Sequence, residues 1–252
     1  MLIDTHTHID MIEGLSLEDV LKNARENNVD KIIVPCAYPK DVDKIYNLAV
    51  KYDDVYGMLG VHPSEARDWD DALAEKIKEY SKNNKIVAIG EIGLDYYWDK
   101  SFNDIQKEVF IKQIKLANEL NLPISIHDRE AHKDTFDILK EYNKNSTIVM
   151  HCFSGSVEFA RECIKEGWYI ALGGVVTFKN AVKTKEVAKD VPLEKLLLET
   201  DAPYLTPVPF RGTENQPSYV RFVAEEIARL REISFEELAD VTTKNAKDIF
   251  NI

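Results

Sequence analysis

Short runs of apolar, β-branched residues recur eight times along this chain, with amphipathic stretches between them. The runs cover residues 2–6, 31–36, 55–61, 86–91, 122–127, 147–151, 168–172 and 196–201. Segments such as Ile32-Ile33-Val34 and Leu196-Leu197-Leu198 are apolar without alternation, which is typical of parallel strands that are buried on both faces. The pattern therefore predicts eight parallel β-strands.

The stretches between these runs have helical periodicity. Ser16 is a candidate N-cap, and after it the spacing i, i+3, i+4, i+7 is apolar at Leu17, Val20, Leu21 and Ala24. A longer helix is expected over residues 102–120, and the chain after Pro217 is expected to be helical. Because eight such β-α units close into a barrel more readily than they form an open sheet, we expect an α/β fold of the TIM (β/α)8 type.

One domain spanning residues 1–252 fits this pattern, since α/β barrels run to roughly 250 residues as one unit. The chain is 44% hydrophobic, which supplies a core. No Gly/Ser-rich linker and no exact repeat divides it. We expect a single TIM-barrel domain over residues 1–252, with a monomer as the default.

Several sequence features predict a protein of the reducing cytoplasm that does not enter a membrane. No apolar run approaches the ~20 residues that a spanning helix needs. The N-terminus has no basic region followed by a long apolar one, so no secretory signal is expected. The three cysteines, Cys36, Cys152 and Cys163, are odd in number and widely spaced, which disfavours a disulfide framework.

Polar residues gather where the predicted strands end. Five of the six histidines take such positions: His6, His8, His62, His127 and His151. Glu91 and Asp201 end the fourth and eighth strands. In a (β/α)8 barrel these C-terminal strand ends form the rim at which catalysis takes place. His6 and His8 are two residues apart, hence on one side of an extended chain, and the set predicts a metal site at the rim.

Six of these residues are candidate metal ligands: His6, His8, Glu91, His127, His151 and Asp201. A single catalytic zinc typically uses three protein ligands and a water, so six ligands indicate two divalent ions. Glu91 is the expected bridge because each of its two oxygens can bind one ion. Four imidazoles favour Zn, Mn, Fe, Co or Ni over a pure Mg site, while the identity of the metal, Mg included, stays open.

Other rim residues are candidates for substrate contact. His62 could be a ligand, a substrate contact or a structural hydrogen-bonding residue, and we favour substrate contact. Arg129 could hold an anionic oxygen or pair with a neighbouring carboxylate. Arg211 lies in a proline-rich segment after the eighth strand, where such barrels often bind phosphate, although a surface ion pair is the alternative. Tyr96, Tyr97 and Trp98 could stack nucleobases or pack as a lid.

The charge balance limits the kinds of nucleic-acid binding that this chain can have. With 32 Lys and Arg against 44 Asp and Glu, the net charge of −12 excludes a broad basic face that coats duplex DNA. Local attraction through metal ions and a few arginines remains compatible with it. The chain has no phosphate-binding GxxxxGK[ST] loop, no HExxH helix and no GxSxG elbow. Cys152 is expected to be a packed thiol, since it points away from the side of the strand that carries His151.

Five segments together resemble the TatD family of metal-dependent hydrolases: DTHTH (4–8), GVHP (60–63), GEIGLDYY (90–97), HCFSGS (151–156) and ETDAPYLTPVPFRGTENQP (199–217). They occur in the family's order and cover nearly the whole chain. The resemblance implies an amidohydrolase-like TIM barrel, a two-metal site on the six candidate ligands, and a deoxyribonuclease that is 3′–5′ exonucleolytic on single strands. The segment HDREA (127–131) fits the family pattern, whereas Ser64 stands where many members carry another histidine.

We therefore expect metal-assisted hydrolysis of DNA, at single strands or 3′ ends. The ligands of the first and eighth strands would hold one ion and those of the fifth and sixth the other, with Glu91 between them. Asp201 would also take the proton of the attacking water. Arg129 and Arg211 would neutralise charge on the phosphate.

Two alternatives remain at this stage. One is a hydrolase of the same architecture that acts on an amide or an aminoacyl ester. Relatives of that kind commonly bridge their metals with a carbamylated lysine, whereas here Glu91 takes the bridging place and no lysine ends a central strand. The other alternative is a metal-stabilised scaffold protein without catalysis.

Overall fold

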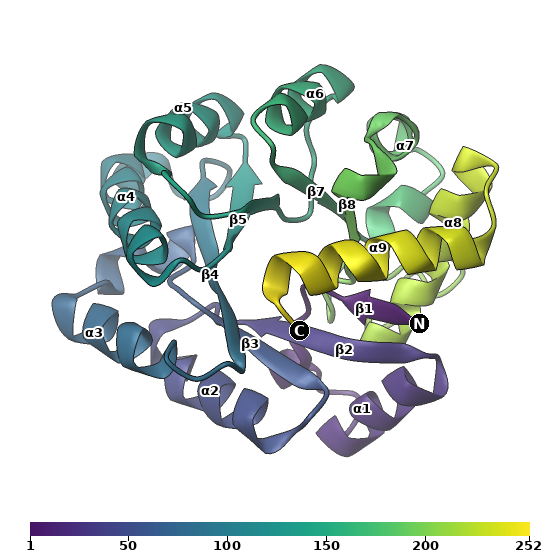
Figure 1. The fold of residues 1–252 in the computed structure, drawn as a ribbon, viewed down its shortest axis with the longest axis horizontal. Coiled ribbons are helices and arrows are strands. Elements are labelled where there is room, and N and C mark those ends of the chain that lie inside the picture. The colour runs from purple at the N-terminus through teal and green to yellow at the C-terminus, as the bar shows by residue number, and fades with distance from the viewer. The chain divides into compact units, whose positions relative to one another are not determined.

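The computed structural model describes residues 1–252, in which parallel strands alternate with helices (Figure 1). The strands are β1 (Leu2–Asp4), β2 (Val29–Pro35), β3 (Val55–Leu59), β4 (Ile86–Asp95), β5 (Ile124–Arg129), β6 (Ile148–Met150), β7 (Tyr169–Leu172) and β8 (Leu196–Leu198). Their order in the sheet is their order in the chain. This succession is that of a (β/α)8 barrel, and the predicted TIM-barrel fold is confirmed.

Nine α-helices connect or follow the strands: α1 (Leu17–Glu26), α2 (Val42–Lys51), α3 (Asp71–Tyr80), α4 (Asn103–Leu120), α5 (His132–Tyr142), α6 (Val157–Lys165), α7 (Val182–Asp190), α8 (Val220–Arg231) and α9 (Phe235–Phe250). Short 3₁₀ helices are η1 (Ile9–Met11), η2 (Pro39–Asp41), η3 (Pro63–Asp68), η4 (Lys100–Phe102), η5 (Gly174–Thr177), η6 (Leu193–Lys195) and η7 (Pro217–Tyr219). The predicted cap is confirmed, since the Ser16 side chain accepts a hydrogen bond from the backbone N–H of Asp19. The long helix and the helical C-terminal region are confirmed as well.

The chain forms two compact units. The first unit comprises Met1–Val34 and Cys152–Ile252, and the second comprises Pro35–His151. In the first unit β1 pairs with β2 and β7 pairs with β8. The backbone N–H of Thr5 donates to the carbonyl of Leu198, which places β1 beside β8. Helix α9, yellow in Figure 1, packs against both of these strands.

The second unit holds four consecutive parallel strands, β3 to β6. Helix α2 packs on β3 and α4 packs on β4. The prediction that Glu91 ends the fourth strand is wrong, because β4 continues to Asp95 with all ten residues buried. Ile92 and Leu94 extend the apolar run beyond the predicted end, and the register between β4 and β5 shifts between Ile89 and Ile92.

A close approach of β4 and β5 depends on a glycine. Gly93 has a φ of +147°, and a Cβ at this position would overlap the backbone carbonyl oxygen of His127 on β5. Only a residue without a side chain allows this backbone conformation and this distance together. The placement of a candidate metal ligand on β5 therefore depends on Gly93.

We expect Gly93→Ala to lower the free energy of unfolding by more than Gly167→Ala does. Gly167 also has a positive φ, +84°, but an added Cβ there would meet nothing within 4 Å. Its replacement therefore costs only the backbone strain of about 1–2 kcal/mol, whereas the change at Gly93 adds a backbone clash. Urea unfolding of both variants measures the difference, and equal losses would contradict the role given to Gly93.

Candidate metal centres

Three of the predicted ligands lie together in the first unit: His6, His8 and Asp201, called here the first cluster. Their ligand atoms lie within 4.8 Å of one another. The Nε2 of His8 is 3.6 Å from Oδ1 of Asp201, and the two imidazole rings are 5.2 Å apart. The backbone N–H of Asp201 donates to the carbonyl of His6 at 2.9 Å. The segments that follow β1 and β8 are thus hydrogen-bonded at the ligands themselves.

Asp4, at the end of β1, adds hydrogen bonds between β1 and the segment that follows β8. Its carboxylate accepts hydrogen bonds from the backbone N–H of Thr200 at 2.9 Å and from the Thr200 hydroxyl at 2.6 Å. Complete burial raises the pKa of Asp4 well above its usual value, and the two hydrogen bonds from Thr200 counteract only part of that shift. Asp4 therefore joins the residue before Asp201 to the strand that leads to His6.

The loop after Asp201 is held by a buried asparagine. The side-chain amide of Asn215 donates to the carbonyl of Thr200 at 2.9 Å and to that of Tyr204 at 2.6 Å. The exposed ring of Tyr204 lies edge-on to the ring of His8, with 6.5 Å between centroids. An exposed aromatic side chain thus lies beside His8 of the first cluster.

The sequence reasoning missed Glu199, which is buried beside the first cluster. A carboxylate oxygen of Glu199 lies within 4.8 Å of a ring nitrogen of His6. The Oε1 of Glu199 accepts a hydrogen bond from the backbone N–H of Cys152 at 2.6 Å. Glu199 opens the ETDAP segment, so its signal was its place in the same motif as Asp201. None of Cys36, Cys152 and Cys163 forms a disulfide.

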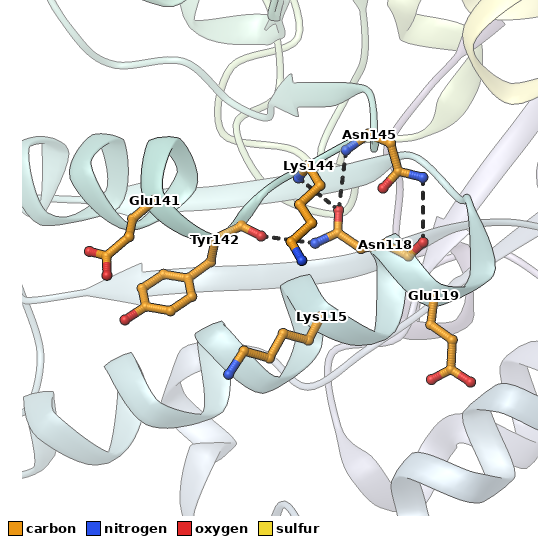
Figure 2. Close-up of a pocket in the computed structure, with 7 residues that line it drawn as sticks. All are labelled: Lys115, Asn118, Glu119, Glu141, Tyr142, Lys144 and Asn145. Carbon is orange, nitrogen blue, oxygen red and sulfur yellow. Dashed lines mark hydrogen bonds between the residues drawn. The ribbon is translucent and has the colours of Figure 1, made fainter.

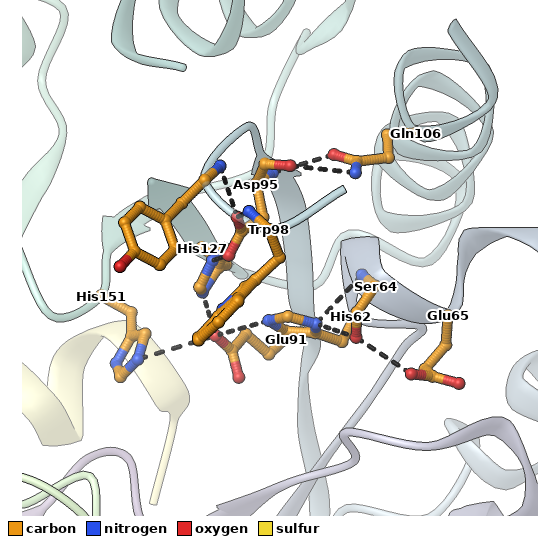
Figure 3. Close-up of polar contacts among 10 residues, drawn as sticks. His62, Ser64, Glu65, Glu91, Asp95, Trp98, Gln106, His127 and His151 are labelled. Carbon is orange, nitrogen blue, oxygen red and sulfur yellow. Dashed lines mark hydrogen bonds and ion pairs between the residues drawn. The ribbon is translucent and has the colours of Figure 1, made fainter. Parts of the chain in front are cut away.

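The remaining ligand candidates lie in the second unit: His62, Glu91, His127 and His151, called here the second cluster (Figure 3). One carboxylate oxygen is at its centre. The Oε1 of Glu91 is 2.8 Å from Nδ1 of His127, 3.7 Å from Nε2 of His151 and 3.8 Å from Nε2 of His62. His62, for which a substrate contact was favoured, therefore lies among the ligand candidates.

The ring of His62 has a fixed orientation. Its Nδ1 accepts the backbone N–H of Ser64 at 3.2 Å and lies 2.7 Å from the Ser64 hydroxyl. Because Nδ1 acts as an acceptor, the neutral ring carries its proton on Nε2, the nitrogen that faces Glu91. Ser64, where many family members carry another histidine, thus sets the orientation of His62 in this chain.

Asp95 is a second residue that the sequence reasoning missed. Its Oδ2 lies 2.9 Å from Nε2 of His127, on the side of the ring opposite to Glu91. Burial alone would raise the pKa of Asp95, but the hydrogen bond and charge of His127 outweigh it and lower that pKa overall. The available signal was the spacing from Glu91 to Asp95, which places both side chains on one face of a strand.

The donor chemistry of both clusters fits divalent transition metals. Each cluster offers at least three buried or half-buried side chains with imidazole nitrogens and a carboxylate. Three protein ligands are the usual number for one catalytic zinc, and imidazole suits Zn, Fe, Ni or Cu better than Mg. The residues of this chain are therefore compatible with resident metal ions.

The two arginines predicted to contact substrate, Arg129 and Arg211, are both exposed, and each belongs to a different unit. The guanidinium of Arg129, at the end of β5, lies 3.9 Å from the ring centroid of Tyr97 and 5.3 Å from that of Trp98. Trp98 is 73% exposed. In the first unit, the guanidinium of Arg211 lies 3.8 Å from the ring centroid of Phe178. Both arginines thus stack on aromatic rings while remaining accessible to solvent.

A separate pocket of about 500 Å³ lies at the C-terminal ends of α4 and α5 (Figure 2). The Asn118 side chain donates to the carbonyl of Tyr142 and accepts from the backbone N–H of Lys144, which ties the two helix ends together. These helix ends precede the N-terminal ends of the strands, whereas the clusters lie toward the C-terminal ends. The pocket is therefore not part of the metal centres.

No helix of the chain combines the length and apolarity that crossing a bilayer requires.

The pair of carboxylates around His127 makes the stability of the metal-free protein depend on pH. Burial alone would lower the pKa of His127, but the hydrogen bonds to Asp95 and Glu91 raise it to about 9. A raised histidine pKa stabilises the fold fully below the unfolded value near 6.5, and this stabilisation is lost as the pH rises through about 9. We expect the stability difference between wild type and His127→Gln, measured by urea unfolding in chelator, to shrink between pH 6.5 and 9. A difference that is constant over this range would contradict the assignment.

Comparison with known proteins finds relatives along the full length of the chain. The sequence profile of the family described as "TatD related DNase" matches residues 3–251. The chain is 50% identical to an uncharacterized metal-dependent hydrolase, YabD, of Bacillus subtilis, over 100% of both chains. It is 40% identical to an uncharacterized metal-dependent hydrolase, YcfH, of Escherichia coli K12, over 100% of this chain and 96% of the relative.

Solved structures also match this chain over nearly its whole length. The crystal structure of the TatD homologue YjjV from Escherichia coli matches with a TM-score of 0.93 and 34% identity, over 100% of this chain and 98% of that one. An uncharacterized amidohydrolase from Saccharomyces cerevisiae matches with a TM-score of 0.83 at 20% identity, which shows the shared fold. The chain belongs to the TatD family of metal-dependent hydrolases.

Proposed function

We propose that this protein is a deoxyribonuclease that hydrolyses phosphodiester bonds of DNA with two divalent ions. The observation that carries the proposal is the division of the donors into two sets, each with imidazole and carboxylate groups, in a chain that a TatD-related DNase profile matches almost completely. Divalent ions in such sites polarise phosphoryl oxygens and lower the pKa of water.

The protein's own groups have distinct tasks in this proposal. The first cluster would hold one ion, and the second cluster, in which the carboxylate of Glu91 is central, would hold the other. Asp201 would accept the proton of the attacking water, since one carboxylate oxygen can bind while the other acts as a base. Arg129 and Arg211 would bind phosphate oxygens and offset the negative charge that develops during hydrolysis.

The aromatic loop that follows β4 supports single strands or 3′ ends as the substrate. Tyr97 and Trp98 lie 4.8 Å apart at their ring centroids, and the indole is largely exposed. Unpaired bases can stack on such rings, whereas the faces of paired bases are covered by their neighbours. The adjacent guanidinium of Arg129 adds a cation where a backbone phosphate would lie. With a net charge of −12, this attraction is local and does not extend over a surface.

The amidohydrolase alternative makes a different prediction for substrates. An imidazole–carboxylate metal site could also activate water for attack on an amide or an aminoacyl ester. The exposed arginines and the aromatic rings of Tyr97 and Trp98 favour a nucleic acid, since a small amide substrate does not require them. A parallel assay of wild-type protein on a single-stranded oligonucleotide and on an aminoacyl ester separates the two functions.

We expect Glu91→Ala to abolish hydrolysis of a single-stranded oligonucleotide, because Oε1 of Glu91 is the oxygen on which the second cluster converges. The matched control is Glu119→Ala on α4, at the remote pocket, which should keep wild-type activity. Circular dichroism confirms that both variants fold. Full activity of Glu91→Ala in metal-supplemented buffer would contradict the proposed function.

Removal of the exposed indole should weaken substrate binding more than the chemical step. A stacked base contributes about 1–3 kcal/mol, so Trp98→Ala is expected to raise the KM for a single-stranded oligonucleotide by roughly 5- to 100-fold with a smaller change in kcat. Tyr142→Ala, which removes an aromatic ring at the remote pocket, serves as the control. An unchanged KM for Trp98→Ala would exclude stacking on this residue.

A further inference from the structure

We propose that Asp95 is a positioning residue that fixes the ring of His127 with Nδ1 toward the ligand set, and that it couples this ring to the aromatic loop of Tyr97 and Trp98. The inference rests on the part of the proposed function that assigns metal binding to the second cluster. It does not depend on the identity of the substrate. The Asp95 side chain has no place in the ligand sets, and its effect is exerted through His127.

The geometry separates the two nitrogens of the imidazole. The Nδ1 of His127 faces Oε1 of Glu91 at 2.8 Å, and Nε2 faces Oδ2 of Asp95 at 2.9 Å (Figure 3). A carboxylate can only accept a hydrogen bond, so Asp95 requires Nε2 to carry a proton. Metal-binding histidines commonly donate their second N–H to a carboxylate or carbonyl, which orients the ring. Both neighbours of the ring are carboxylates, but Glu91 belongs to the ligand set and Asp95 does not. Nδ1 is therefore the nitrogen that faces the ligand set, and the geometry assigns it as the ligand nitrogen.

Asp95 is itself held from α4. The side-chain oxygen of Gln106 accepts the backbone N–H of Asp95 at 2.9 Å, and the amide of Gln106 donates to the Asp95 carbonyl at 3.0 Å. Gln113 holds Val61, the residue before His62, in the same way, with distances of 2.7 and 3.0 Å. Both glutamines are buried and seven residues apart, hence on one face of the helix. Helix α4 thus fixes the backbone of Asp95, whose side chain contacts His127, and the backbone of Val61, which precedes His62.

The second oxygen of the same carboxylate reaches the loop. The Oδ1 of Asp95 accepts the backbone N–H of Tyr97 at 2.9 Å and that of Trp98 at 3.3 Å. Asp95 is 3% exposed, so these bonds lie in a protected environment in which hydrogen bonds to a charged group are strong. One side chain therefore sets both the ligand ring and the start of the exposed aromatic surface.

Asp95→Asn separates these two tasks. The amide oxygen of asparagine can still accept the loop N–H groups, while its NH₂ group then faces Nε2 of His127 and requires an acceptor there. The proton of the neutral ring is thereby moved to Nδ1, the nitrogen needed for the metal. Replacement of the aspartate that orients a catalytic histidine by asparagine is known to preserve geometry while producing the wrong tautomer.

The test adds Co²⁺ alone to the metal-free full-length protein and follows visible absorption, which reports imidazole coordination. We expect Asp95→Asn to weaken one bound equivalent by about 10- to 100-fold and to leave the other unchanged. The matched control is Asp99→Asn, in the same loop, whose carboxylate accepts only from the segment around Ser101. It should bind Co²⁺ as wild type does.

A second variant and a second measurement keep the test decisive if Asp95→Asn is unstable. Gln106→Leu frees the backbone of Asp95 but keeps its carboxylate, and it should weaken the same equivalent by less. In ¹⁵N-imidazole spectra of the Zn²⁺-loaded wild type, the His127 signal, assigned by its absence in His127→Gln, should show a proton on Nε2. A proton on Nδ1 with the metal on Nε2 would overturn the inference.

The inference is also overturned if Asp95→Asn binds Co²⁺ as Asp99→Asn does, or if it weakens both equivalents alike together with a lower Tm. The first result would show that Asp95 does not position His127, and the second that its role is general stability. Because the probe is a metal ion alone, failure of the wild type to cleave DNA would refute the proposed function and leave the role of Asp95 standing. If Asp95→Asn binds Co²⁺ with unchanged affinity while the wild type cleaves DNA, the role given to Asp95 is refuted and the proposed function stands.

Discussion

A half-buried imidazole between two buried carboxylates is the interaction on which the second unit depends. Charged groups are unfavourable inside a protein unless they are paired and hydrogen-bonded. His127 meets this requirement through Glu91 on one side and Asp95 on the other. The same contacts that compensate the buried charge in the metal-free protein define the direction in which a metal ligand points. Stability and site geometry therefore come from one set of hydrogen bonds.

In the first unit, a buried carboxylate is hydrogen-bonded by neutral groups. The carboxylate of Asp4 is buried completely and receives its hydrogen bonds from the backbone and hydroxyl of Thr200. Asn215 satisfies carbonyls of the loop that follows Asp201. In both units, polar side chains behind the ligands fix backbone segments that are distant in sequence. Such support is what holds donor atoms in place for catalysis.

Much of this architecture is predictable from periodicity, because strands buried on both faces and helices with one apolar face have distinct patterns. The cap at Ser16 and the eight strands are examples. The extension of β4 beyond Glu91 was missed because a carboxylate in a buried strand looks like a strand end, and only the pairing with β5 shows otherwise. Asp95 and Glu199 were missed because their roles depend on hydrogen-bond partners that lie far along the chain, and such partners cannot be identified from the local sequence.

The proposed hydrolysis depends on metal ions occupying both clusters. The most direct measurement is an anomalous difference map from crystals grown with Zn²⁺. We expect two peaks, one bound by His6, His8 and Asp201 and one by Nδ1 of His127 with Glu91, at ligand distances of about 2.0–2.2 Å. A map with no peak at either cluster, or with Zn²⁺ only at surface carboxylates, would contradict the account.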